Sequence, residues 1–153
     1  MLSRAIWGKG TTGSAFSIYE GKASELHAKV GEISVTFMGP HRANVINLLN
    51  LIATREDQIE YQRLAPVNVA NELVNQWFND FYHPSDKAFR SEFSNDELAQ
   101  LANFNEYYER RVVVLPDTLD ALLNSSEWND VVALARNVLD GCGWRGIEAR
   151  YDF

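Results

Sequence analysis

The hydrophobic pattern of this chain changes period at Gly39-Pro40, and this change limits the fold more than any other feature of the sequence. Before it, apolar residues alternate with polar ones, as in strands with one buried face. After it, they recur every three or four residues, as in amphipathic helices. We therefore expect an N-terminal sheet followed by a helical part, in one α+β domain.

Three short runs before Gly39 have the composition and alternation of β-strands, over residues 15–20, 25–30 and 32–37. Gly31 separates the last two runs and suits a tight reversal. Because consecutive strands joined by short turns pair antiparallel, the pattern predicts an antiparallel sheet of three or four strands. Two later segments are candidates for a further strand, residues 112–115 and 146–151.

Apolar stripes of helical period after Gly39 predict four or five helices packed against this sheet. The first stripe can be continued to Leu64, before Pro66 ends it. Trp77 lies in the middle of the second stripe, so we predict that it anchors the core. No repeat or low-complexity linker divides residues 1–153, which favours a single domain. The predicted helices span residues 44–54, 68–81, 94–110, 119–123 and a last segment from 125 or 126 to about Gly141.

The strongest local signal lies between Phe93 and Leu98. Ser94 and Glu97 have the spacing of a capping box, in which each side chain accepts a hydrogen bond from the backbone N–H of the other residue. Phe93 and Leu98 occupy the two positions of a hydrophobic staple. These signals predict a helix that begins after Ser94 and continues to about Arg110.

Composition excludes several classes of protein. The chain has 153 residues, 46% of them hydrophobic and 23% charged, which is ordinary for a globular protein and unlike a disordered or collagen-like chain. No apolar run approaches the roughly 20 residues of a membrane span, and the first residues lack the apolar stretch of a signal peptide. The single cysteine, Cys142, cannot form an internal disulfide. We therefore expect a cytoplasmic protein that does not associate with membranes.

The net charge of −7 is unevenly distributed along the chain. Residues 1–65 sum to +1, whereas residues 66–153 sum to −8. A part this acidic repels phosphate, so nucleic acid is not expected as a direct partner. A basic protein surface would instead be attracted and steered toward it. The alternative is that the acidity serves solubility alone.

No motif in the chain specifies a reaction. The loop over residues 8–14 has the glycine spacing of a phosphate-binding loop, but serine stands where the lysine is required. Cys142 follows a predicted helix C-terminus, where the helix dipole raises rather than lowers the pKa of a thiol. We therefore expect no catalytic residue, cofactor or metal. The histidines also lack metal-ligand spacing, at positions His27, His41 and His83.

One part of the chain resembles a pattern found in small bacterial proteins. The residues of this chain that carry the resemblance are 71–84, 93–94, 97–98 and 101–104. In size and acidity the chain is similar to the immunity proteins of bacterial toxin systems, including those of contact-dependent growth inhibition. This resemblance implies a protein that binds and inhibits a toxin. It carries over no functional residue.

The sequence thus supports the hypothesis of an immunity protein that covers the basic surface or active site of a cognate toxin. Two alternatives stay open: a small enzyme that uses a carboxylate pair in a groove between sheet and helices, and an oligomeric structural or adaptor protein. Asp96 and Glu97 are not predicted to bind the partner, because their position at the start of a helix already explains them. The carboxylates predicted to bind the partner lie on outer helical faces: Glu72, Asp80, Glu106, Glu109, Asp117, Asp120 and Asp130.

Overall fold

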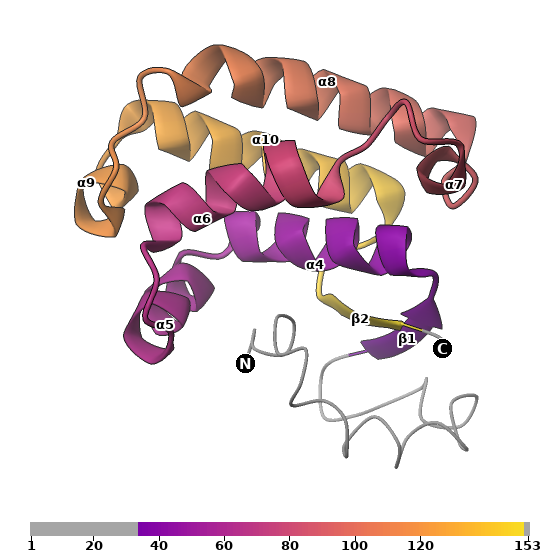
Figure 1. The fold of residues 1–153 in the computed structure, drawn as a ribbon, viewed down its shortest axis with the longest axis horizontal. Coiled ribbons are helices and arrows are strands. Elements are labelled where there is room, and N and C mark those ends of the chain that lie inside the picture. Colours follow the sequence, from indigo (N-terminus) through magenta and orange to yellow (C-terminus); the bar gives the residue numbers. More distant parts are fainter. Residues whose placement is uncertain (1–33, 152–153) are drawn as a thin grey trace.

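The computed structural model describes residues 34–151, which form a mainly helical body (Figure 1). Seven α-helices, one π-helical segment and one two-stranded parallel sheet are found among these residues. The predicted α+β fold, with an antiparallel sheet of three or four strands and four or five helices, is therefore wrong. The predicted strands over residues 15–20 and 25–30 lie outside the described residues.

The sheet pairs the two ends of the described part. Strand β1 (Ser34–Met38) lies parallel to β2 (Ile147–Tyr151), with Ser34 opposite Ile147. The predicted ranges 32–37 and 146–151 thus each contain a strand, over residues 34–37 and 147–151, but the two strands pair in parallel and not in an antiparallel meander. All the described helices lie between the two strands, and so long a connection lets the chain return in the same direction.

Helix α4 (Pro40–Ala53) is the central element of the core. It begins at Pro40, earlier than predicted, because proline suits a first helical position, where the missing N–H has no intrahelical partner. The helix does not continue to Leu64. The chain takes an extended conformation at Thr54, and α5 (Arg55–Leu64) begins there as a separate helix. The buried residues of α4 are Ala43, Val45, Ile46, Leu48, Leu49, Leu51, Ile52 and Ala53.

Two asparagines of α4 hold the C-terminal segment in place. The Asn47 side chain donates to the Ala149 carbonyl at 2.9 Å and accepts from the Ala149 N–H at 3.0 Å. One turn along, Asn50 donates to the Trp144 carbonyl at 3.2 Å and accepts from the Gly146 N–H at 3.1 Å. Each side-chain amide thereby satisfies backbone groups as a neighbouring strand would.

The helix predicted over residues 68–81 is confirmed in extent but not in type. It consists of α6 (Val69–Asn75) followed by the π-helical segment η1 (Gln76–Phe81). A π-helix has a wider turn than an α-helix, so side chains drift around the axis. Gln76, the first residue of η1, is polar and yet only 4% exposed.

Trp77 is an anchor of the core, as predicted, and is fully buried. Its ring stacks on Tyr82 with the centroids 4.7 Å apart and meets the edge of Phe104 at 4.9 Å. The indole Nε1–H donates to the Asn105 side chain at 3.0 Å, so the polar atom of the ring is also satisfied. Trp77 therefore connects η1 to the next long helix.

That helix is α8 (Asn95–Val112), which follows the short and unpredicted α7 (Lys87–Arg90). The capping box is confirmed, since the Glu97 N–H donates to Ser94 Oγ at 3.1 Å and the Ser94 N–H donates to Glu97 Oε1 at 2.9 Å. The valines after Arg111 form no strand. They end the helix in a turn, closed by a hydrogen bond from the Val114 N–H to the Arg111 carbonyl at 3.0 Å.

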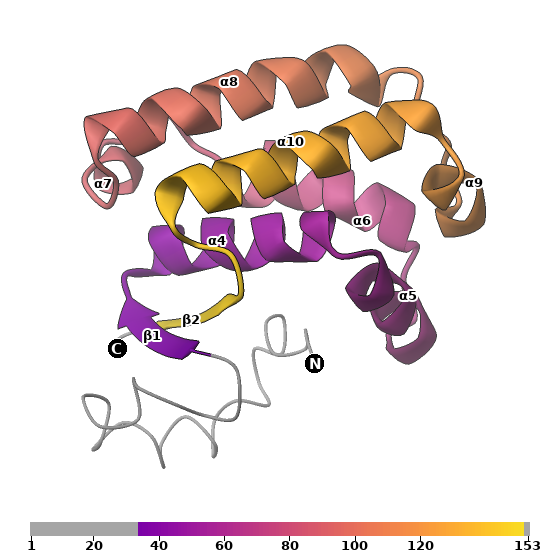
Figure 2. The same cartoon turned by 180° about the vertical axis from the view of Figure 1, so that it is seen from behind.

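The last two helices begin close to where the sequence predicts. Helix α9 (Leu119–Leu123) is capped by Thr118, and α10 (Ser126–Cys142) is capped by Ser125. Helix α10 ends at Cys142, close to the predicted Gly141, and the left-handed residue after it is Gly143, with φ 74°. Figures 1 and 2 show α6 and α10 between α8 and α4, with the sheet on the opposite side of α4 from α8.

A network of charged groups closes the N-terminal end of α4. The Arg42 guanidinium donates to both carboxylate oxygens of Glu97, at 2.8 and 2.9 Å, and to the Glu92 carbonyl at 2.9 Å. A Glu92 carboxylate oxygen accepts from the Arg42 N–H at 2.8 Å and so caps α4 in place of the side chain that Gly39 lacks. A Cβ at Gly39 would approach that oxygen to 2.5 Å.

The Glu97 carboxylate makes stability depend on pH. The hydrogen bond from Arg42 lowers the pKa of this carboxyl, against the opposing effect of partial burial. Its stabilisation is therefore present above the unfolded-state pKa of about 4.3 and is lost as pH falls through the lower folded-state pKa. We expect Glu97→Gln to cost about 2 kcal/mol at neutral pH and much less in acid, as measured by urea unfolding at both pH values.

The matched control is Asp96→Asn, which removes an exposed carboxylate from the same helical turn. It is expected to cost less than Glu97→Gln at neutral pH, because Asp96 has no ion-pair partner among the described residues. A cost of Glu97→Gln that stays constant between neutral and acid pH would contradict this account.

Candidate functional site

The seven predicted carboxylates do not form one patch. Glu72 on α6 is half-buried, and its carboxylate lies 3.4 Å from the Gln76 amide nitrogen, which also lies 3.4 Å from the Tyr61 hydroxyl. Asp80 is exposed in η1, at the end of α6 that points away from α9. Glu72 therefore belongs to a largely internal polar cluster, and Asp80 stands apart from the remaining residues.

Two more of the predicted carboxylates face arginines of the same chain. Glu106 lies 3.7 Å from Arg110, and Asp130 lies 3.8 Å from Arg111. Arg111 also stacks over the Tyr107 ring, with its guanidinium carbon 3.6 Å from the ring centroid. Since these carboxylates are partly neutralised, they attract a basic partner less strongly than the sequence alone suggests.

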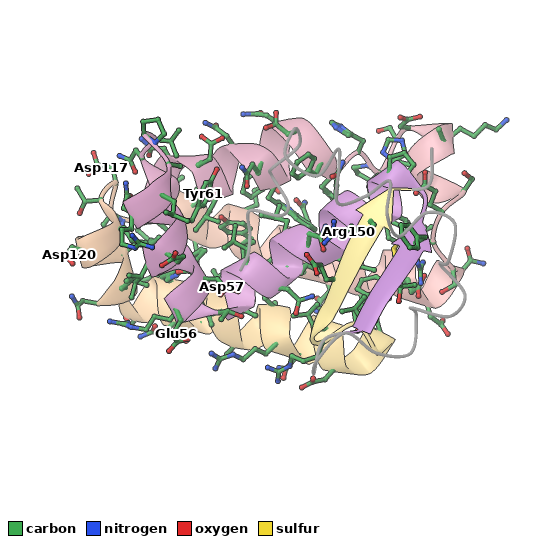
Figure 3. All side chains as sticks on the ribbon, turned by 90° about the horizontal axis from the view of Figure 1, so that it is seen from below. Glu56, Asp57, Tyr61, Asp117, Asp120 and Arg150 are labelled. Atoms are coloured by element: carbon green, nitrogen blue, oxygen red, sulfur yellow. The ribbon has the colours of Figure 1, made fainter. Side chains whose placement is uncertain are left out.

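The structure instead brings together carboxylates at the α5–α9 end, which we define as α5, α9 and the loops over residues 65–68 and 113–118. Asp117 precedes α9 and Asp120 lies in its first turn, while Glu56 and Asp57 lie in the first turn of α5. Figure 3 shows Asp117 and Asp120 at the outer edge of this end, with Glu56 and Asp57 farther in. Glu109, near the end of α8, is also exposed.

Sequence reasoning missed Glu56 and Asp57 because they lie in the half of the chain with a net charge of +1. Only the packing of α5 against α9 brings them near Asp117 and Asp120. The local signal for their positions is helical: acidic side chains in the first turn of a helix are stabilised by the dipole. That signal alone indicates a helix start and gives no hint of a shared surface.

Arginines near this end already have partners in the chain, whereas several carboxylates do not. Arg55 donates to the Leu123 carbonyl at 3.2 Å, and Arg63 lies 2.6 Å from Glu60. Within the described residues, no ion pair is made by the carboxylates of Glu56, Glu109, Asp117 and Asp120. Among the described residues, the negative charge of these four carboxylates is therefore not balanced by an ion pair.

Exposed aliphatic side chains lie at the same end. Val113 is 81% exposed and Val114 is 60% exposed, in the turn that follows α8. Leu64 ends α5, and Val67 lies in the loop that follows it. Together with Ile59 of α5, these are the most exposed large aliphatic side chains of the described part. Apolar side chains grouped among charges are typical of protein-binding surfaces.

A shallow hollow lies between the two loops of the α5–α9 end. The Asn68 side chain donates to the Asp117 carbonyl at 2.8 Å and so fixes one loop against the other. The Gln62 side chain donates to the Val67 carbonyl at 2.7 Å and accepts from the Val69 N–H at 3.1 Å, which fixes the turn between α5 and α6. The hollow is lined by Gln62, Ala65, Pro66, Val67, Asn68, Thr118 and Leu119.

Other kinds of site find little support in residues 34–151. No group of three or more histidine, cysteine or acidic side chains in this range is placed to hold a metal ion. Burial raises the pKa of the Cys142 thiol, which disfavours the thiolate that a nucleophile needs. Within the same range, no helix has the length and apolar character to span a bilayer.

The carboxyl groups with clear pKa shifts are also unlike general acids. A hydrogen bond from Arg42 lowers the pKa of Glu97, and one from Arg145 lowers the pKa of Asp140. The pKa of Glu127 is lowered by a hydrogen bond from the backbone N–H of the same residue. A general acid that works near neutral pH needs the opposite shift. These three groups therefore give no support to the alternative of an enzyme with a carboxylate pair.

Comparisons with known proteins leave the family open. No protein-family model matches the chain, and no curated protein or solved structure is significantly similar to it.

Proposed function

We propose that this chain is a cytoplasmic binding protein that inhibits a basic protein, in the way that an immunity protein neutralises a cognate toxin. The observation that carries the proposal is the composition of the α5–α9 end, which holds exposed aliphatic side chains as well as carboxylates that have no ion-pair partner among the described residues. Charge of one sign selects and steers a partner of the opposite sign. Apolar contacts supply the affinity that exposed charges alone do not.

The proposed mechanism is the occupation of a cationic surface. Toxins that cleave nucleic acid bind phosphate through lysine and arginine side chains, and carboxylates can take the place of the phosphates. In this chain Asp117, Asp120 and Glu56 would face those cations, with Glu109 at the edge of the surface. Glu106 and Asp130 would contribute less because arginines of the chain already face them.

The test is co-expression with the product of the reading frame beside the gene for this chain. If that product is toxic, the wild-type chain is expected to restore colony formation and to form a complex that elutes as one peak in size-exclusion chromatography. Raising the salt concentration is expected to weaken this complex. Growth arrest that the chain does not relieve, together with separate elution of the two proteins, would overturn the proposal.

Charge reversal then tests whether the acidic surface is responsible. Glu56→Lys, Asp117→Lys and Asp120→Lys together are expected to slow association by about tenfold or more, measured by stopped-flow or surface-based kinetics. The control is Asp80→Lys with Asp96→Lys, which alters exposed carboxylates outside the α5–α9 end. Equal association rates for the two variants would show that the carboxylates of the α5–α9 end do not steer the partner.

A further inference from the structure

We infer that the partner docks on an aliphatic rim, defined as Leu64, Val67, Val113 and Val114, and that it does so with a segment in which cationic and apolar side chains alternate. The inference rests on the proposed function, since it names the surface and the chemistry of a basic partner. Val67 lines the hollow between the two loops of the α5–α9 end. Leu64 ends α5 directly before one loop, and Val113 and Val114 begin the other, which the hydrogen bond from Asn68 to the Asp117 carbonyl holds against the first.

The first argument is the exposure of the rim. Val113 and Val114 expose 81% and 60% of their surface, and Leu64 exposes 57%. Elsewhere in the described residues, large aliphatic side chains are well buried. The valine, leucine and isoleucine side chains of α4 that face the core, for example, are almost completely inaccessible to solvent. Covering four such side chains on binding removes apolar area from water, at about 25 cal/mol per Å².

The second argument is that the valines are held in a fixed position. The Val114 N–H donates to the Arg111 carbonyl at 3.0 Å, and the Leu115 N–H donates to the Val112 carbonyl at 3.3 Å. Leu115 packs against the core directly after them. Because the turn is already ordered, binding loses little conformational entropy there.

The third argument selects the occupant by charge. The carboxylates of Asp117 and Asp120 are exposed, have no ion-pair partner in the described part and lie next to the hollow, which Thr118 and Leu119 help to line. The C-terminal end of α5, at Leu64, adds the partial negative charge of a helix dipole. Lysine and arginine combine an apolar stem with a charged end, so they can contact the rim and the carboxylates together.

The same charges argue against other occupants. A second copy of this chain would bring the carboxylates of two α5–α9 ends together, and like charges across an interface are repelled. A phosphate backbone or an anionic lipid surface would be repelled for the same reason. A basic protein segment is the occupant that satisfies both the aliphatic and the acidic parts of the surface.

The docking test uses a probe that does not depend on knowing the toxin. The chain, labelled at valine and leucine methyl groups, is titrated with a twelve-residue peptide of alternating arginine and leucine, and separately with its glutamate–leucine counterpart. The expected result is that the arginine peptide shifts the methyl signals of Val67, Val113, Val114 and Leu64. The glutamate peptide is expected to leave these signals unchanged.

Two variants make the assignment specific. Val113→Ser with Val114→Ser, both at exposed positions, and Asp117→Asn with Asp120→Asn are each expected to weaken peptide binding by about fivefold or more. The matched control for the second pair is Asp80→Asn with Asp96→Asn, which is expected to leave peptide binding unchanged. Circular dichroism checks that each variant is folded.

The outcomes separate the docking surface from the function. Peptide-induced shifts elsewhere in the chain, or unchanged peptide binding by both variant pairs, would overturn the inference that the rim is the docking surface. A dimer of the chain that Val113→Ser with Val114→Ser dissociates would identify a second copy as the occupant and would also overturn it. Toxin neutralisation that survives this double substitution would overturn the rim but leave the proposed function standing. Peptide binding localised to the rim, in a chain that does not neutralise the toxin, would support the docking surface and overturn the proposed function.

Discussion

Replacing Trp77 by alanine is expected to lower the free energy of unfolding by about 3–5 kcal/mol. The side chain is fully buried between Tyr82 and Phe104, so the substitution leaves a cavity that the surrounding rings cannot fill without moving. It also removes the donor to Asn105. Urea unfolding followed by circular dichroism measures the change. The dependence of the unfolding free energy on urea concentration checks that the variant and the wild-type protein expose the same surface when they unfold.

The control for this substitution is Trp77→Phe. Phenylalanine keeps most of the ring contacts and loses the hydrogen bond to Asn105, so a loss smaller than that of alanine is expected. If Trp77→Ala costs less than about 1 kcal/mol, the ring cannot be packed as described. The same result would weaken the view that η1 is held to α8 through this residue.

Replacing Gln58 by leucine is expected to cost about 3 kcal/mol, although leucine has nearly the same size and is more apolar. Gln58 is completely buried. Its amide nitrogen donates to the Leu51 and Ile52 carbonyls at 2.9 and 2.8 Å, at the C-terminal end of α4. Its oxygen accepts from the Trp128 indole N–H at 3.3 Å. Leucine would leave three buried polar groups without this partner.

Gln62→Leu is the matched control, because Gln62 also makes hydrogen bonds through both ends of its side-chain amide, in this case to the Val67 carbonyl and the Val69 N–H. Its side chain is only half-buried, so water can replace those bonds, and a loss below about 1 kcal/mol is expected. Thermal or urea unfolding of both variants provides the comparison. Equal losses at positions 58 and 62 would show that burial does not determine the cost.

Local signals in the sequence predict local structure well. The capping box of Ser94 and Glu97 depends on residues three apart, and both of its hydrogen bonds are present. The strand over residues 32–37 is also real, but its pairing was wrong because a strand's sequence does not identify its partner. The π-helical segment has no signal in the apolar periodicity, which predicts one continuous helix over residues 68–81.

The candidate site was predictable only in part, for a similar reason. Asp117 and Asp120 were identified from the acidity of the second half of the chain, whereas Glu56 and Asp57 required the packing of α5 against α9. The run Val112-Val113-Val114 has strong β-propensity and suggested a strand. Val112 instead ends α8, and Val113 and Val114 form the turn after it with both side chains exposed, where no strand of the described residues pairs with them.

The asparagine pairs of α4 have a consequence for the order in which the chain can fold. Asn47 and Asn50 bond to backbone groups of residues 144–149, and β1 pairs with the strand that contains Ala149. During synthesis α4 therefore emerges from the ribosome long before the segment that saturates these two side chains. The helical core can assemble first, and the sheet closes last because its contacts are the most distant in sequence. In refolding followed by pulsed hydrogen exchange, the amides of β2 are accordingly expected to gain protection after those of α8 and α10.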